Sequence, residues 1–451
     1  MNKNSLPIIM NVLLLFGISI SCLAQNPFIK DQFTADPSAR VIGNKVYVFP
    51  SHDIKAPANK NLRENWFCME DYHVFSSENL TDWTDHGVIV TQNKVPWVRP
   101  DSYSMWAPDC IERNGKYYFY FPTFPKDTIA HGSGFTVGVA IADKPEGPYI
   151  PEATPIKGIR GIDPNVFIDD DGQAYLYWSA GEIFGAKLKE NMVELDSEVK
   201  TLSNFPKVGL KEGPYLFKKN GLYYMTYPHV ENKTERLEYA ISDNPLGPFT
   251  FTGVIMDESP TGCWTNHQSI IEFKNQWYLF YHSNDLSPQF DKNRSIRIDS
   301  LFFNEDGTIQ KVIPTLRGVG LTNAANEIQI DRYSHKSNEN VSIHFIDTLN
   351  RFAGWKTVFE KTGGWVQYNS VDFGKKAFTT IQVKAQSTKS GTITVRLNNA
   401  NGPVIATISI GNKNEWTVYK NKIQQFKPGV QHLFVQLMKG NDVEIDWLRF
   451  E

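Results

Sequence analysis

The stretch NGKYYFY at residues 114–120 decides the fold, because the chain repeats its pattern of a tight turn followed by alternating aromatic residues. Four more segments share this pattern: GNKVYVF at 43–49, DGQAYLYW at 171–178, NGLYYM at 220–225 and NQWYLFY at 275–281. Asn-Gly and Asp-Gly favour the two-residue turns of β-hairpins. Each copy therefore predicts a hairpin.

The spacing of the copies predicts their arrangement. The Asn or Asp of successive turns lies 70, 57, 49 and 55 residues apart, and no helical periodicity fills the intervals. Further strand-like pieces lie between them, at 73–75, 137–140, 237–240 and 296–298. Five repeats of three to four strands predict an all-β fold with a five-bladed β-propeller. A sandwich of irregular hairpins is the alternative.

One position of the repeat carries residues suited to chemistry. Eight residues before the Asn or Asp of each turn, the copies hold Asp36, Trp106, Asp163, Glu212 and His267. The first strand of a propeller blade lies innermost, so we expect these side chains to meet at one mouth of the central channel. Like charges crowded together repel, which indicates a functional reason for three carboxylates. Glycoside hydrolysis needs one carboxyl to protonate the leaving oxygen and another at the anomeric centre, and a third raises the pKa of the acid.

These residues and their surroundings resemble glycoside hydrolase family 43. The resemblance covers roughly residues 28 to 320, and within the family it is nearest to the arabinoxylan arabinofuranohydrolase and β-xylosidase branch. The segments that carry it are DPS at 36–38, WAPD at 106–109, GIDP at 161–164, EGP at 212–214 and NHQSI at 266–270. It implies that Asp36 is the general base, Glu212 the general acid, and Asp163 the residue that raises the pKa of Glu212 and orients it.

The resemblance also implies binding roles. Arg294 is expected to contact a substrate hydroxyl, with a surface salt bridge as the alternative. Trp106 is expected to stack on the sugar rather than only to pack the channel. Asp53 is expected at the pocket rim. His267 resembles the family's central histidine, which ligates a structural calcium ion through a mostly water shell; a hydrogen-bonded core histidine is the alternative.

The repeated turn-and-aromatic pattern ends at about residue 322. Alternating strands at 380–384, 392–397, 404–408 and 432–435 predict a jelly-roll-like β-sandwich over 322–451, after a propeller over 27–321. The stretches GGWVQY at 363–368 and IDWL at 445–448 resemble carbohydrate-binding module family 6. Gln329 and Asp331 stand where that family has an acidic pair, and Glu444 replaces an Asn. Gln329, Asp331 and Asp446 are candidates for a structural calcium site, and the module either binds sugar or stabilises the propeller.

The N-terminus predicts export. Lys3 precedes the apolar run VLLLF at 12–16, and small residues follow, which is typical of a signal peptide over residues 1–24. A lipoprotein acylated at Cys22 is the alternative. Three cysteines remain, which allow at most one disulfide: Cys68, Cys110 and Cys263. The apolar run is too short for a transmembrane span, and a net charge of -3 argues against nucleic-acid or anionic membrane partners.

Together these features predict an exo-acting, inverting hydrolase that removes terminal α-L-arabinofuranose or β-D-xylose from plant cell-wall glycans such as arabinoxylan. Inversion is expected because Asp36 and Glu212 belong to the first and fourth blades, which are not neighbours, so that a water fits between base and sugar. The chain is expected to act as a monomer and to need no cofactor for the chemistry. An endo-arabinanase with an open groove and a non-catalytic sugar-binding propeller are the alternatives. The loops at about 54–70 and 121–135 decide between pocket and groove.

Overall fold

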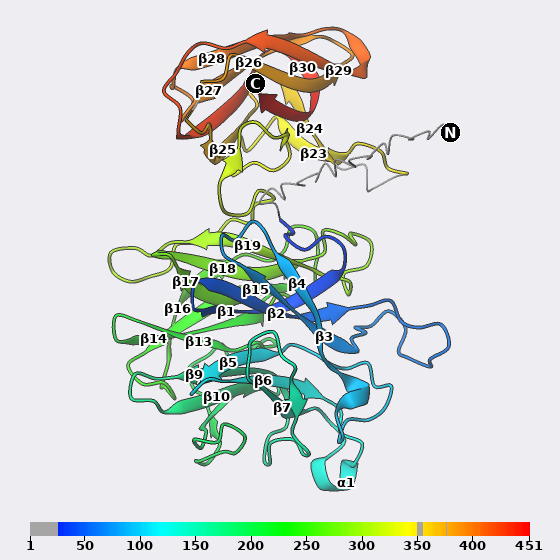
Figure 1. Ribbon diagram of the computed structural model, residues 1–451, viewed down its shortest axis with the longest axis vertical. Coiled ribbons are helices and arrows are strands. Elements are labelled where there is room, and N and C mark those ends of the chain that lie inside the picture. Colours follow the sequence, from blue (N-terminus) through cyan, green and yellow to red (C-terminus); the bar gives the residue numbers. More distant parts are fainter. Residues whose placement is uncertain (1–25, 350–354, 376) are drawn as a thin grey trace, which may run out of the picture.

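The computed structural model describes residues 26–349, 355–375 and 377–451. The predicted signal segment and Cys22 lie outside the described residues. Among the described residues the helical content is limited to α1 (Thr128–His131) and the 3-10 turn η1 (Gln92–Lys94). Five small sheets form a propeller, and a separate domain of strands follows it (Figure 1). The predicted all-β fold is confirmed.

Each blade is an antiparallel sheet whose strands follow one another in sequence. Blade 1 contains β1 (Phe33–Ile42), β2 (Lys45–Asp53), β3 (Asp71–Ser77) and β4 (Thr84–Thr91). Blade 2 contains β5 (Asp109–Arg113), β6 (Lys116–Thr123), β7 (Thr136–Ala142) and β8 (Ile150–Pro151). Blade 3 contains β9 (Ile162–Ile168), β10 (Ala174–Ser179), β11 (Ile183–Lys187) and β12 (Lys200–Thr201).

Blades 4 and 5 complete the ring. Blade 4 contains β13 (Tyr215–Lys219), β14 (Leu222–Val230), β15 (Glu235–Ser242) and β16 (Thr250–Met256). Blade 5 contains β17 (Ser269–Phe273), β18 (Gln276–Ser283) and β19 (Ser295–Leu301). The repeated aromatic segments form the second strand of every blade. Their side chains alternate between the two faces of a sheet, and both faces are covered because a neighbouring blade packs on each.

The hydrophobic core is divided among the five gaps between adjacent blades. One buried cluster fills each gap, the last one joining blade 5 to blade 1. Between blades 1 and 2, for example, the rings of Phe49 and Phe119 lie 5.9 Å apart. The aromatic repeat therefore supplies the side chains that hold successive blades together.

Polar side chains on the inner strands link the blades around the channel. Asp109 of blade 2 accepts hydrogen bonds from Ser38 Oγ of blade 1 at 2.5 Å and from Asn165 Nδ2 of blade 3 at 3.0 Å. Asn165 Oδ1 accepts from the backbone N–H of Leu216 in blade 4 at 2.9 Å. Ser269 of blade 5 donates to the carbonyl of Pro37 in blade 1. These bonds fix the inner strands, on which the carboxylates stand.

The C-terminal domain is a β-sandwich, as predicted. Its strands are β20 (Thr322–Asn323), β21 (Ile328–Gln329), β22 (His335–Lys336), β23 (Val341–Phe345), β24 (Trp355–Lys361), β25 (Trp365–Asp372), β26 (Thr380–Ser387), β27 (Gly391–Leu397), β28 (Val404–Ile410), β29 (Lys413–Lys422) and β30 (Val430–Phe450). The first half of β30 pairs with β25 and β27, and its second half pairs with β24 and β26. This long strand therefore belongs to both layers, which enclose one apolar core.

The N-terminal segment lies at the seam of the ring and beside the sandwich. Asn26 donates from Nδ2 to the carbonyls of Thr315 at 2.8 Å and Ile298 at 3.0 Å, and its own carbonyl accepts from Arg332 of the second domain. Phe28 stacks on Trp83 of blade 1 at 4.5 Å. Asn26 thus connects blade 5, the linker and the sandwich.

The cysteines and the helices of the described residues have two further features. The cysteines that remain after the predicted signal segment are buried and unpaired: Cys68, Cys110 and Cys263. No helix among the described residues is long and apolar enough to cross a membrane.

Candidate active site

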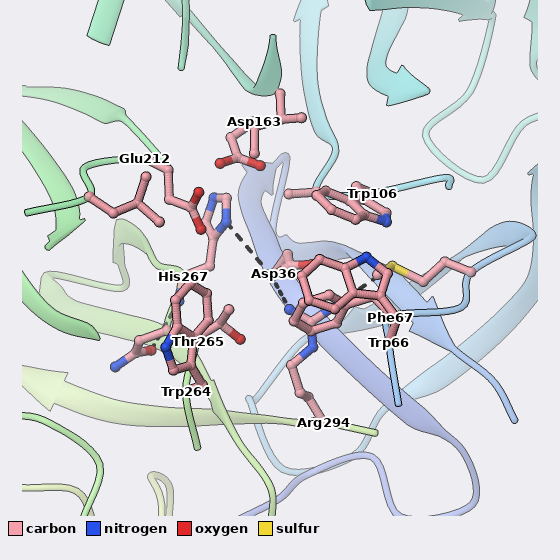
Figure 2. A pocket seen from close by; sticks show the side chains of 15 residues that line it. Asp36, Trp66, Phe67, Trp106, Asp163, Glu212, Trp264, Thr265, His267 and Arg294 are labelled. Carbon is pink, nitrogen blue, oxygen red and sulfur yellow. Dashed lines mark hydrogen bonds and ion pairs between the residues drawn. The ribbon is translucent and has the colours of Figure 1, made fainter. Parts of the chain in front are cut away.

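A cavity of about 220 Å³ opens at one mouth of the propeller channel. Asp36, Asp163 and Glu212 line it together with His267 and Arg294 (Figure 2). Four aromatic side chains also line it: Trp66, Phe67, Trp106 and Trp264. The five side chains that stand eight residues before the turns, one for each blade, therefore all line this cavity.

A β-bulge aims two of the carboxylates. On β1, residues 35 and 38 pair with residues 51 and 49, so one residue is extra, and β9 repeats this irregularity between residues 162 and 165. The extra stretch contains Asp36 and Asp163, whose φ angles of 48° and 57° are left-handed. Non-glycine residues rarely adopt this conformation, and it turns their side chains out of the sheet alternation into the channel.

Blade 4 uses the same bend differently. Gly213, with φ 54°, occupies the bent position before a proline that Asp36 and Asp163 occupy in their blades. Glu212 comes one residue earlier, and its N–H lies 3.4 Å from the carbonyl of Pro228 on β14. The structural equivalent of Asp36 and Asp163 in blade 4 is therefore Gly213, and Glu212, which the eight-residue count selected, lies one residue before it. Its side chain reaches the same cavity nonetheless.

Asp36 is held as a carboxylate by its surroundings. Its Oδ1 accepts a hydrogen bond from Arg294 Nη1 at 2.7 Å, and its Oδ2 accepts from Ser51 Oγ at 2.7 Å. Burial would raise the pKa of Asp36, but the charge of Arg294, helped by His282 and His267, outweighs it and lowers the pKa to about 2. Asp36 is thus ionised at any physiological pH.

Asp53 lies behind the cavity wall instead of at the rim. It is only 1% exposed, and both of its oxygens accept from the Arg294 side chain at 2.9 Å. The expected position of Asp53 at the pocket rim, where it would bind substrate, is therefore wrong. Asp53 does not line the cavity, whereas the Arg294 side chain that it binds does. Arg294 is correspondingly a buried residue with two carboxylate partners, and the surface salt bridge is excluded.

Asp163 joins blade 3 to the backbone beside Glu212. Its Oδ2 accepts from the N–H of Gly213 at 3.0 Å and from Ser179 Oγ at 3.3 Å. Burial, together with the negative charges of Glu212 and Asp36, raises the pKa of Asp163 to about 7 against the opposing effect of His267. The protons of these neighbouring carboxyls are consequently shared among interacting groups.

A fourth buried carboxyl, Glu235, lies next to Glu212. Its Oε2 accepts from the N–H of Asn266 at 2.6 Å. Burial raises the pKa of Glu212, and burial together with the Glu212 charge raises the pKa of Glu235 well above its usual range. Sequence reasoning missed Glu235 because it starts the third strand of its blade, outside the repeat signature.

Aromatic residues from loops close the cavity. Trp106 is half-buried and packs against Phe67 at 5.7 Å and Phe135 at 4.5 Å between ring centroids. Trp66 and Phe67 belong to the loop between β2 and β3, and the Arg294 guanidinium lies over the Phe67 ring at 4.8 Å. Sequence reasoning did not select these two. Two adjacent aromatic residues in an otherwise polar loop were the available signal.

The candidate calcium residues fit an ion unequally. His267 and Gln268 line a small axial cavity below the carboxylates, and Gln268 Oε1 has no hydrogen-bond partner among the described residues. An unpartnered amide oxygen beside an imidazole fits a hydrated ion or a water molecule there.

In the sandwich, Asp331 and Asp446 are both buried, and each already has a cationic partner. Arg332 Nε lies 3.1 Å from Asp331, and Lys384 Nζ lies 2.8 Å from Asp446. Gln329 pairs through its backbone with Trp447 on β30. A calcium ion here would take the place of the Lys384 ammonium beside Asp446, and the site stays a prediction.

Comparisons with known proteins agree on one family. Residues 24–309 match Glycosyl hydrolases family 43, and residues 333–451 match Carbohydrate binding module (family 6). A "Xylosidase/arabinosidase 43A" from Humicola insolens is 37% identical over 63% of this chain and 98% of its own. An "Arabinoxylan arabinofuranohydrolase" from Bacillus subtilis (strain 168) is 28% identical over 94% of this chain and 92% of its own.

Solved structures point the same way. A GH43 β-xylosidase/α-arabinofuranosidase from a compost microbial metagenome, in complex with xylotriose, is 36% identical with a TM-score of 0.58, covering 64% of this chain and 97% of its own. The arabinoxylan arabinofuranohydrolase from Bacillus subtilis, in complex with cellotetraose, is 25% identical with a TM-score of 0.55, covering 94% of this chain and 97% of its own. The second comparison spans both domains.

Proposed function

The chain belongs to glycosyl hydrolases family 43 and is a glycosidase, and from that premise we propose that it is an inverting, exo-acting enzyme that releases terminal α-L-arabinofuranose or β-D-xylose from plant cell-wall glycans such as arabinoxylan. The observation that carries this proposal is the small cavity in which three carboxylates face an aromatic wall. Relatives named as xylosidases, arabinosidases and an arabinoxylan arabinofuranohydrolase support the choice of sugars.

Asp36 is the general base in this proposal. With a pKa of about 2 it is ionised, and it takes a proton from water as the water attacks the anomeric carbon. Arg294 fixes the orientation of the Asp36 carboxylate and presents its guanidinium to the cavity, where it contacts a sugar hydroxyl. Asp53 positions that guanidinium from behind.

Glu212 is the general acid. Burial raises its pKa, which keeps a proton available for the glycosidic oxygen as the bond to the anomeric carbon breaks. Asp163 orients Glu212 through the N–H of Gly213. The reaction balances without a cofactor: the hydroxyl of the water joins the anomeric carbon, its proton goes to Asp36, and the leaving oxygen takes the proton of Glu212. A calcium ion at His267 and Gln268 would add positive charge beneath the carboxylates.

Exo action follows from how the cavity is closed. Trp66 and Phe67 come from the loop at 54–70, and Phe135 from the loop at 121–135 packs on Trp106. These are the two loops expected to separate a pocket from a groove. Rings from the first loop line the cavity, and a ring from the second loop supports Trp106 from behind. A cavity enclosed in this way favours a chain end over the middle of a polysaccharide, and its rings suit the apolar faces of a sugar ring.

Two experiments test the proposal. Proton NMR of the first sugar released, recorded before mutarotation, is expected to show the anomer opposite to that of the substrate. Release of the same anomer would overturn inversion and the role of Asp36. Glu212→Gln is expected to lose far more activity on arabinoxylan fragments than on nitrophenyl glycosides, whose acidic leaving group needs little protonation.

The sandwich and the N-terminus have accessory roles in this proposal. The protein is exported through residues 1–24, which brings it to polymeric substrate, and it acts as a monomer. Glu444, which replaces the expected Asn, is bound by Lys356 Nζ at 2.7 Å and by Gln386. This occupied carboxylate favours a stabilising role for the sandwich over sugar binding at that position.

A further inference from the structure

Glu235 is a buried carboxyl for which the reaction described above has no use. It begins β15, is 1% exposed, and its N–H donates to the carbonyl of Trp264 at 3.0 Å. Its Oε2 accepts from the N–H of Asn266 at 2.6 Å, whereas its Oε1 has no protein donor in the described part of the chain. Its two backbone partners, Trp264 and Asn266, line the same cavity as Glu212. Glu212 is also the ionisable side chain that acts on Glu235 most strongly.

The charges that act most strongly on Glu235 are negative. Glu212 and Asp163 act on it with negative charge, and its one donor is the neutral backbone N–H of Asn266. A buried carboxylate with an unsatisfied oxygen is costly, and two adjoining carboxylates do not both ionise. A proton on Glu235 removes both penalties at once, because a protonated carboxyl becomes a hydrogen-bond donor to its partner.

We propose that Glu235 is a positioning residue: a carboxyl that stays protonated and donates a hydrogen bond to Glu212. The proposal rests on Glu212 being the general acid. In the reaction the O–H bond of Glu212 breaks, its proton joins the glycosidic oxygen, and the electron pair of the breaking C–O bond goes to that oxygen. Glu212 is left as a carboxylate, and Glu235 keeps its own proton while its hydrogen bond to Glu212 strengthens.

This hydrogen bond acts mainly in the transition state. Hydrogen bonds to charged groups are markedly stronger than those between neutral groups, and the charge on Glu212 appears only as the leaving group departs. Loss of the bond is therefore expected to lower kcat by roughly 10- to 100-fold when the leaving group needs a proton. KM is expected to change little, because Glu235 does not line the cavity.

The test uses the full chain with Glu235→Gln and Glu235→Met. Glutamine keeps a neutral donor for Glu212 and an acceptor for Asn266, whereas methionine keeps only the volume. Glu238→Gln is the matched control, since Glu238 is equally buried on the same strand but binds His229 Nδ1 at 2.9 Å and Arg236 Nε at 2.7 Å instead of Glu212. Each variant is assayed on a xylo- or arabino-oligosaccharide and on the corresponding nitrophenyl glycoside, after its thermal unfolding is compared with the parent.

The expected pattern is near-parental activity for Glu235→Gln and Glu238→Gln, and a selective loss of kcat on the oligosaccharide for Glu235→Met. Equal losses on both substrates, or a Gln variant as impaired as the Met variant, would overturn the proposal. If the Met variant does not fold, the pH profile of Glu235→Gln decides. A charged Glu235 would raise the pKa of Glu212, so a downward shift of the alkaline limb in Glu235→Gln refutes the protonated donor, and an unmoved limb supports it. Absence of leaving-group dependence in Glu212→Gln would instead refute the general acid itself.

Discussion

Arg294→Met tests the electrostatics of the site, because one guanidinium serves two buried carboxylates. It donates to Asp36 at 2.7 Å and to both oxygens of Asp53 at 2.9 Å. The pKa of Asp36 is about 2 instead of 3.8, which corresponds to about 2.5 kcal/mol of stability. Removing one partner of a buried ion pair costs about 3–5 kcal/mol, and Arg294→Met leaves two carboxylates without their cation.

The sign of the pH dependence follows from the lowered pKa. Because the pKa of Asp36 is lower in the folded protein than in the unfolded chain, its contribution to stability is fully present above about pH 4 and is lost as the pH falls toward 2. In Arg294→Met this contribution disappears at neutral pH as well. Asp36 then takes up a proton in a higher pH range and no longer accepts one from water.

Urea unfolding at pH 7 and the pH profile of kcat/KM on a nitrophenyl glycoside measure both effects. The Met variant is expected to lose about 3–5 kcal/mol of unfolding free energy and to show its acid limb at a higher pH than the parent. Arg294→Lys is the control that keeps the charge but not the double hydrogen bond. A loss below about 1 kcal/mol with an unchanged profile would refute the reasoning, since it lies in the range of exposed pairs.

Two further outcomes are expected. Gly213→Ala places a Cβ 2.9 Å from a proline ring at a φ of +54°, so this variant should lose at least ~1–2 kcal/mol of unfolding free energy and, by misplacing Glu212, should have a lower kcat. The control Gly221→Ala, with a φ of +79° and open space around its Cβ, should lose stability without losing kcat. Equal losses of kcat in the two variants would contradict the prediction. A chain ending at residue 321 should keep its activity on nitrophenyl glycosides. The sandwich contributes no residue to the cavity, and it contacts the seam of the propeller ring through the hydrogen bond from Arg332 to Asn26. A soluble but inactive truncated protein would show that the sandwich helps to build the site.

Much of the fold was predictable because the signal is repeated. Each aromatic segment, such as 117–120, is covered on both faces by neighbouring blades, so its composition reflects a constraint that recurs in every blade. Asp36 and Asp163 were found for the same reason, since both precede a proline at one bent position. The same eight-residue count also selected Glu212, although in blade 4 the position equivalent to Asp36 and Asp163 is Gly213, one residue later.

The rest of the site depends on contacts that no local pattern encodes. Glu235 meets Glu212 only because β15 lies beside the loop at Trp264. Trp66 and Phe67 reach the cavity through a loop whose path depends on tertiary packing. Asp53 was expected at the pocket rim, yet it binds the Arg294 guanidinium and does not line the cavity. Loop paths and side-chain facing at strand ends are set by the assembled ring and not by local sequence.

The bent position before the proline gives the site an evolutionary vulnerability. Asp163 adopts a strained left-handed conformation, of order 1–3 kcal/mol, and burial raises its pKa to about 7, so its ionisation is also penalised in the folded state. Gly213 fills the equivalent place with neither burden. Glycine at position 163 would relieve both penalties but would leave the buried N–H of Gly213 without its acceptor. Variants of position 163 that gain thermal stability are therefore the ones to assay first for lost hydrolysis.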